Sequence, residues 1–239
     1  MIIFLCSPSD ISAPCFLATL RHQYGIKAKI ITPQELVYAP AMEHCLDGHH
    51  VTSSVTTSTH GTLDDTSMTA VVNRLDWLPD AHLTTVNTTD RSYIQQELQA
   101  IWSSWISALP CLVINRPTAT SMSGPTFHHA IWQHYAALTG LPTAPMIYDS
   151  AQPEPTPILP VHSIIVCQDR CHSTSSLSQL YESCRNLADY TGFDMLEIFF
   201  GEGPDGKVVF SHASSTPYLN HTVSSLTSQM AQMLQGGTL

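Results

Sequence analysis

Apolar and polar residues follow one another along the first part of the chain in blocks that predict an α/β start. Residues 2–6 form a continuous apolar run, which is typical of a strand covered on both faces. Residues 11–24 carry apolar side chains at helical spacing, and Gly25 follows them as a helix-ending residue. A second short strand over 28–31 then predicts a right-handed parallel crossover.

The rest of the chain continues this pattern, with one Thr- and Ser-rich interruption. Residues 43–69 have high strand propensity and no helical spacing, so they predict either a β-hairpin or an irregular excursion. Further strands are expected at 70–75, 111–115, 161–167, 194–200 and 207–211, and helices at 90–109, 126–139, 175–190 and 222–234.

A Pro-rich stretch predicts the boundary between two halves of the chain. Residues 149–160 contain four prolines among Gln, Glu and Thr, which is the composition of a linker. We therefore expect an α/β domain over 1–148, a linker over 149–160 and an α+β domain over 161–239.

Composition then excludes several classes of function. The chain has 239 residues, of which 43% are hydrophobic and only 12% charged, with a net charge of -10 and three lysines. A nucleic-acid-binding surface needs clustered Lys and Arg, so no nucleic-acid partner is expected. The apolar N-terminal run is too short for a signal sequence or a membrane span, so no membrane partner is expected either. Seven scattered cysteines without an export signal are typical of reduced thiols in a cytoplasmic protein.

Several short motifs resemble a known family. Asn-Arg-Pro at 115–117 follows an apolar strand, and Gly-Leu-Pro at 140–142 ends the helix after it. With the order of elements, these motifs resemble the N-terminal domain of ATP-grasp ligases, especially the ribosomal-protein glutamate ligase type and the ligases that modify ribosomal peptides. Residues 188–194 and 205–210 resemble the last strands of the grasp domain. The resemblance implies a pre-ATP-grasp parallel-sheet domain followed by a reduced grasp-like α+β domain.

The resemblance also implies groups that this sequence lacks. The family's central subdomain supplies two lysines for the ATP phosphates, but the corresponding stretch between Pro145 and Val161 contains no Lys or Arg. Its magnesium site is a Glu-x-Asn in the last strand, and residues 210–217 contain neither Glu nor Asn. Cations for phosphates and carboxylates for magnesium are what such a site needs. We therefore expect a truncated, degenerate protein without the central subdomain that binds neither ATP nor magnesium.

Two Asn-Arg pairs supply the candidate ligand-binding residues, Asn73, Arg74, Asn115 and Arg116. Each pair follows an apolar run, so both pairs are expected at the carboxyl ends of parallel strands, where open α/β sheets bind ligands. Two guanidinium groups there can hold a carboxylate or a peptide terminus. The alternative is that the arginines fix loops by pairing with Asp76, Asp90 or Glu97.

Histidines and cysteines raise the alternative of a metal site. The local groups are His44 with His49 and His50, His128 with His129 and His134, and Cys167 with Cys171, His172 and the more distant Cys184. The histidines lack the i, i+4 spacing that places two ligands on one helix face, and the cysteines lack a second close pair. Polar surface histidines and buried thiols are the ordinary alternative, so Cys167, Cys171 and His172 are only weak candidates.

No catalytic residue is assigned. The sequence contains no Gly-x-Ser-x-Gly nucleophile motif. Glu197, among apolar neighbours, is either a buried functional carboxylate or a partner of Arg170 or Arg185.

The first hypothesis is a non-catalytic, ATP-grasp-like accessory protein that binds a partner protein or peptide in a peptide-modification or cofactor-maturation system. The alternatives are an active ATP-dependent carboxylate–amine ligase with an unconventional or partner-completed site, and a His/Cys metal-binding module.

Overall fold

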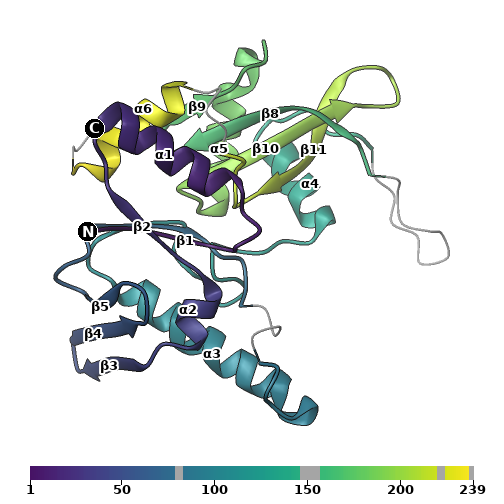
Figure 1. The fold of residues 1–239 in the computed structure, drawn as a ribbon. Coiled ribbons are helices and arrows are strands. Elements are labelled where there is room, and N and C mark those ends of the chain that lie inside the picture. The colour runs from purple at the N-terminus through teal and green to yellow at the C-terminus, as the bar shows by residue number, and fades with distance from the viewer. Residues whose placement is uncertain (79–82, 146–156, 220–223, 237–239) are drawn as a thin grey trace. The chain divides into compact units, whose positions relative to one another are not determined.

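The computed structural model describes residues 1–78, 83–145, 157–219 and 224–236. These residues form two compact units, one made of Met1–Gly124 with Leu219–Leu239 and the other of Pro125–Tyr218. The helices and strands of both units are labelled in Figure 1. Each unit has its own hydrophobic core.

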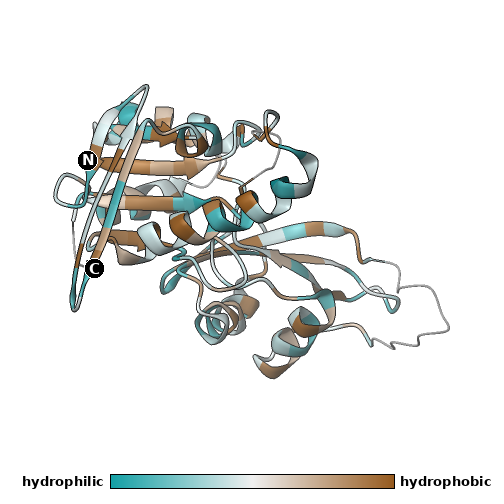
Figure 2. Ribbon diagram, turned by 90° about the horizontal axis from the view of Figure 1, so that it is seen from below, coloured by the Kyte–Doolittle hydropathy of each residue, from teal (hydrophilic) through white to brown (hydrophobic). Residues whose placement is uncertain are grey.

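The first unit is built on a parallel sheet in the order β2-β1-β6-β7. Its strands are β1 (Ile2–Cys6), β2 (Ala28–Ile31), β6 (Ala70–Arg74) and β7 (Leu112–Ile114). Every residue of β1 and β6 is buried, which explains the continuous apolar run of β1 and the apolar start of β6, whose last two residues are the buried polar Asn73 and Arg74. The predicted α/β start is therefore confirmed. The hydropathy colouring of Figure 2 shows brown strands beside helices that mix brown and teal.

Among its described residues, the first unit contains the helices α1 (Ser12–Tyr24), α2 (Pro33–Val37), α3 (Thr88–Ala108) and α6 (Ser224–Leu234). Gly25 ends α1 in a left-handed conformation, with φ of 68°, and its N–H donates to the last carbonyls of the helix. The longest helix, α3, buries Trp102 and Trp105 in the core of the unit. Its N-cap is Asn87, whose side chain accepts the N–H of Thr89.

The Thr- and Ser-rich interruption folds as a three-stranded antiparallel sheet. The strands are β3 (Ala41–Asp47), β4 (His50–Thr57) and β5 (Gly61–Asp64), in that order. Two of its apolar side chains, Val55 and Leu63, are fully buried in the core of the first unit, whereas Leu46 is exposed. The segment is thus a folded sheet, one strand longer than the predicted hairpin.

The second unit is an antiparallel sheet with helices on one face. The strand order is β11-β10-β8-β9, formed by β8 (Pro160–Cys167), β9 (Arg170–His172), β10 (Met195–Glu202) and β11 (Val208–Ser214). Helices α4 (His129–Leu138) and α5 (Tyr181–Thr191), with the short 3₁₀ turn η2 (Ser178–Leu180), complete it. Trp132, Ala136 and Leu187 pack with the buried apolar side chains of the strands. The fold class expected for the chain is confirmed.

The two units do not follow the expected division into 1–148 and 161–239. Helix α4 belongs to the second unit because Trp132 and Ala136 join its core, and α6 belongs to the first because it packs on α1. Most of the expected linker lies outside the described residues. In the described helices, no segment has the length and hydropathy needed to cross a membrane.

Candidate functional site

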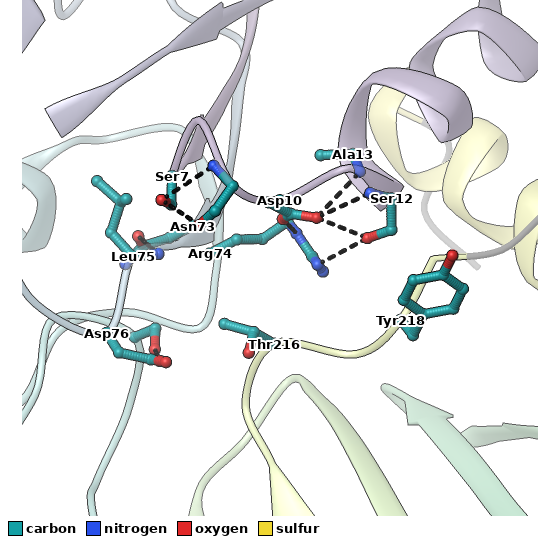
Figure 3. Close-up of polar contacts among 12 residues, drawn as sticks. Ser7, Asp10, Ser12, Ala13, Asn73, Arg74, Leu75, Asp76, Thr216 and Tyr218 are labelled. Carbon is teal, nitrogen blue, oxygen red and sulfur yellow. Dashed lines mark hydrogen bonds and ion pairs between the residues drawn. The ribbon is translucent and has the colours of Figure 1, made fainter. Parts of the chain in front are cut away.

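The carboxyl end of β6 carries an ion pair that joins distant parts of the sequence. The Nε of Arg74 donates to Oδ2 of Asp10 at 2.7 Å, and an Nη2 hydrogen of Arg74 is donated to Oγ of Ser12 at 3.2 Å. Figure 3 shows the three side chains gathered between the end of β6 and the start of α1. The Arg74 side chain is only 2% exposed and that of Asp10 15%. A guanidinium so deeply buried requires a carboxylate partner.

Asp10 organises the start of α1 through its other oxygen. Oδ1 accepts the backbone N–H groups of Ser12 at 3.1 Å and Ala13 at 3.2 Å, and the Ser12 hydroxyl at 2.7 Å. Burial works against ionisation of Asp10, but the hydrogen bonds and the charge of Arg74 outweigh it, so the pKa of Asp10 is lowered. The same burial, with the negative charge of Asp10, raises the pKa of Cys6 to about 11. The site therefore contains an ionised carboxylate and a protonated thiol at neutral pH.

One hydrogen-bond donor of Arg74 remains available. Its Nη1 is buried and has no hydrogen-bond partner among the described residues. A buried donor without an acceptor costs roughly 1–3 kcal/mol, and more for a charged group. An incoming carbonyl or carboxylate oxygen would recover that free energy, so this atom is the feature of the site best suited to a ligand.

The two candidate asparagines take part in hydrogen bonds between the backbone segments at the ends of β6 and β7. Asn73 donates from Nδ2 to the carbonyls of Asn115, at 3.0 Å, and of Met122, and its Oδ1 accepts the N–H of Leu75 at 3.3 Å. Asn115 lies just after β7 with a left-handed φ of 58°, which Asn adopts more readily than most residues. Asn73 thereby connects the ends of two neighbouring parallel strands.

The side chain of Arg116 binds backbone carbonyl groups. Its guanidinium donates to four carbonyls at the end of α3 and just beyond it, those of Ile106, Ser107, Leu109 and Cys111, at 2.9–3.5 Å. The last carbonyls of a helix lack N–H partners from a following turn, and here, among the described residues, only that of Ile106 also accepts a backbone N–H, from Leu109. Arg116 therefore caps the carboxyl end of α3. The structure thus places both arginines at the carboxyl ends of parallel strands, as expected, but gives them different partners from the predicted Asp76, Asp90 and Glu97. A ligand-binding role for Asn73, Arg74, Asn115 and Arg116 stays a prediction.

In the second unit, the stretch that the resemblance would align with a magnesium site, residues 210–217, carries neutral side chains. On β11, Ser211 donates to the carbonyl of Ile158 at 2.6 Å, and His212 stacks on Phe199 with ring centroids 4.3 Å apart. Burial, and then the charge of His129, lowers the pKa of His212. The nearby buried carboxylate is Glu197, whose Oε2 accepts the N–H of Tyr218 at 2.8 Å. Neither Arg170 nor Arg185 pairs with Glu197 in the part of the chain that the structure describes.

The pairing of β8 with β9 places the weak metal candidates Cys167, Cys171 and His172 on two different faces of the sheet. Cys171 lies opposite Val166 and His172 opposite Ile165, so Cys171 faces one side of the sheet while Cys167 and His172 face the other. Within the described ranges, no three His, Cys, Asp or Glu side chains are grouped so that they could hold a metal ion.

This chain resembles known proteins in its three-dimensional structure but not detectably in its sequence. No protein-family model matches the sequence. No curated protein sequence matches it either. Solved structures with the same arrangement of elements do match, over almost the whole chain.

Three of these structures are a macrocyclase and two ATP-grasp ligases. The macrocyclase MdnC of Microcystis aeruginosa, bound with precursor peptide MdnA, matches with a TM-score of 0.68 and 12% identity over 100% of both chains. A RiPP-associated ATP-grasp ligase of Chryseobacterium gregarium, in complex with ADP and a leader and core peptide, gives 0.69 and 8% over 100% of this chain and 97% of that one. The ATP-grasp ligase PsnB, complexed with a phosphomimetic variant of its minimal precursor, Mg and ADP, gives 0.69 and 13% over 100% and 98%. The chain has an ATP-grasp-like fold.

The expectation that the chain binds neither ATP nor magnesium is corrected by these structures. Proteins that share its fold over nearly their full length were solved with ADP and, for PsnB, with Mg. The expectation rested on counting lysines and acidic residues in short sequence stretches. Ligand groups in a folded protein come from any element that reaches the site, so their absence from one stretch does not exclude binding.

Proposed function

We propose that this protein is an accessory protein of a ribosomal-peptide-modifying system that binds a peptide or partner protein in the cytoplasm without catalysing ligation itself. The observation that carries the proposal is the buried, unpartnered Nη1 of Arg74 at the carboxyl end of β6. A peptide carbonyl or carboxylate is the acceptor that such a donor requires. Three structures with this fold were solved with peptides bound, which supports a peptide as the ligand.

The absence of ligase activity is supported by the chemistry of β11. Within β11, Ser211, His212 and Ser214 offer no carboxylate that could position a metal for ligation, while other elements can still supply ligands for a bound nucleotide. The pKa of His212 is lowered, so this side chain adds no positive charge at neutral pH. Nucleotide binding is compatible with this role, since an accessory protein can hold a nucleotide without turning it over.

The alternative function is an active ATP-dependent carboxylate–amine ligase whose site is completed by a partner. It is favoured by the ADP and Mg in structures with the same fold. The two functions differ in what the purified chain does with MgATP and peptide. An active ligase releases phosphate and removes one water from the peptide for each bond formed, whereas an accessory protein binds the peptide and leaves its mass unchanged.

Fluorescently labelled peptides, chosen from open reading frames next to the gene of this protein, test the proposal directly. We expect fluorescence anisotropy to show binding, with affinity lowered about tenfold in Arg74→Lys. That variant keeps the positive charge for Asp10 but removes Nη1. Lys207→Ala, which alters an exposed ion pair with Asp205 in the other unit, is the matched control. Phosphate release together with a loss of water from the peptide would establish the ligase instead, and peptide binding of equal strength in Arg74→Lys would remove the basis of the proposal.

A further inference from the structure

A second polar feature of the first unit lies beside its edge strand. A cavity of about 440 Å³ is bordered by α1 and by the residues that lead into β2. Its lining combines apolar side chains, such as Leu17 and Ile26, with the cations Arg21 and Lys27 and with Ala28, the first residue of β2. The groups that line it make none of the hydrogen bonds described for the Arg74 site.

On the side away from β1, β2 pairs with no other strand among the described residues, although a side chain from the turn before β5 contacts its far end. β2 is an edge strand, paired only with β1 in the parallel sheet. The carbonyl of Ile30 accepts from Nε2 of His60 at 2.9 Å, so the peptide groups of Ile30 point outward. Because the direction of these groups repeats every second residue, the N–H and C=O of Ala28 point the same way. Ala28 thus presents one donor and one acceptor of an open sheet edge where it lines the cavity.

The charge of the cavity is unusual for this protein. Arg21 and Lys27 are two of only nine Lys and Arg residues in a chain with a net charge of -10. Both are exposed, and neither forms an ion pair with any residue that the structure describes. The position of Arg21 in the last turn of α1 suits the negative end of the helix dipole. Lys27 lies beyond that helix, so the dipole does not account for the pair of cations.

We propose that this groove binds an extended acidic segment of the peptide by strand addition to β2. The peptide backbone hydrogen bonds to Ala28, apolar side chains lie over Leu17 and Ile26, and Asp or Glu carboxylates pair with Arg21 and Lys27. Strand addition gives affinity through the main chain, while alternate side chains give specificity. This inference rests on the proposed peptide-binding function and names the segment chemistry and the docking surface that the function requires.

The probe is a labelled alternating peptide, Glu-Val-Glu-Val-Glu-Val, titrated by fluorescence anisotropy into the full chain. We expect binding that weakens as salt is raised, and a loss of about tenfold or more in the Arg21→Ala, Lys27→Ala double variant. Lys207→Ala is the control for removal of an exposed cation and should bind as the unaltered protein does. Both altered residues are exposed, so the double variant should retain its fold, which circular dichroism checks.

Backbone methylation separates strand addition from simple charge attraction. N-methyl groups on the Glu nitrogens and on the Val nitrogens block opposite edges of an extended peptide. We expect one of the two methylated peptides to lose binding and the other to keep it. Equal effects of the two, or undiminished binding by the double variant, would overturn the inference.

The same measurements distinguish this inference from the proposed function. Arg74→Lys should leave the alternating peptide's affinity unchanged while it weakens the natural peptide. If the natural peptide binds equally well to the groove variant, the groove inference is wrong and the proposed function stands. If the alternating peptide binds in the groove but no natural peptide binds the chain, the proposed function is wrong.

Discussion

Arg74 Nε lies 2.7 Å from Asp10 Oδ2 and thereby ties the end of β6 to the loop that leads into α1. The two residues are 64 positions apart in the sequence. Since Asp10 also accepts the N–H groups of Ser12 and Ala13, one carboxylate both neutralises a buried guanidinium and starts a helix. This double role predicts that the pair matters for stability as well as for the ligand site.

Removing Asp10 should therefore destabilise the protein strongly. In Asp10→Ala the buried Arg74 loses its counter-ion, and breaking a buried pair in this way costs about 3–5 kcal/mol. Urea unfolding of the variant should show that loss in the free energy of unfolding. Asp205→Ala, which removes an exposed partner of Lys207, should leave the midpoint unchanged. A double variant, Asp10→Ala with Arg74→Met, should recover part of the loss, and no recovery would show that helix capping by Asp10 is the larger contribution.

The same pair predicts a loss of stability in acid. The pKa of Asp10 is lower in the folded chain than in the unfolded chain, so its contribution is fully present above the unfolded value of about 3.9. That contribution is lost as the pH falls through the folded pKa, because the proton binds the unfolded state first. Asp10→Asn should thus be less stable at neutral pH and show a flatter decline below pH of about 4. Thermal unfolding over an acid pH series measures both slopes, and parallel slopes would contradict the assignment.

Arg116 should affect stability rather than ligand affinity. Arg116→Ala leaves the carbonyls at the end of α3 without their donor, which should cost roughly 1–3 kcal/mol in urea unfolding. Arg170→Ala, which removes an exposed arginine of β9, should have little effect. If Arg116→Ala weakens peptide binding while stability is unchanged, the residue contacts the ligand instead.

Gly201 should tolerate no side chain. A Cβ at this position would contact the carbonyl oxygen of Leu159 and lie 2.5 Å from Cγ2 of Ile158, which is closer than atoms can approach. Overpacking of this kind typically costs about 1–3 kcal/mol. Gly201→Ala should lower the unfolding midpoint by more than Gly203→Ala, whose nearest contacts are the methyl groups of Val209 at 3.3 Å. Equal midpoints for the two variants would mean that the Ile158–Leu159 segment moves away without cost.

The cysteines should differ sharply in reactivity. Burial, reinforced by the charges of Asp194 and Asp169, raises the pKa of Cys167 to about 12. Burial likewise raises the pKa of Cys184, whereas Cys15 and Cys45 are exposed. Because the thiolate is the reactive form, iodoacetamide should label Cys15 and Cys45 in the native protein and the buried thiols only after unfolding. Peptide mass spectrometry identifies the labelled sites, and early labelling of Cys167 would contradict the described burial.

Local patterns were enough to predict most elements of this fold. The apolar run of β1 and the helical spacing in α3 depend on neighbours in the sequence, which the burial of those elements bears out. The hydrogen bonds of Asp10 to the start of α1 are equally local, since they join residues two and three positions apart. The assignment of α4 and α6 to units was not accessible in this way, because it depends on which distant surface each apolar face covers.

The candidate site likewise has features that follow from local sequence and others that depend on tertiary contacts. The sequence by itself determined that Arg74 and Arg116 follow parallel strands, because strand ends are marked by the change from apolar to polar residues. Only the tertiary structure decided that Arg74 pairs with Asp10 and keeps a free donor at Nη1, while Arg116 caps α3. Such long side chains reach partners from any element packed nearby, so their roles depend on three-dimensional neighbours that sequence spacing does not encode.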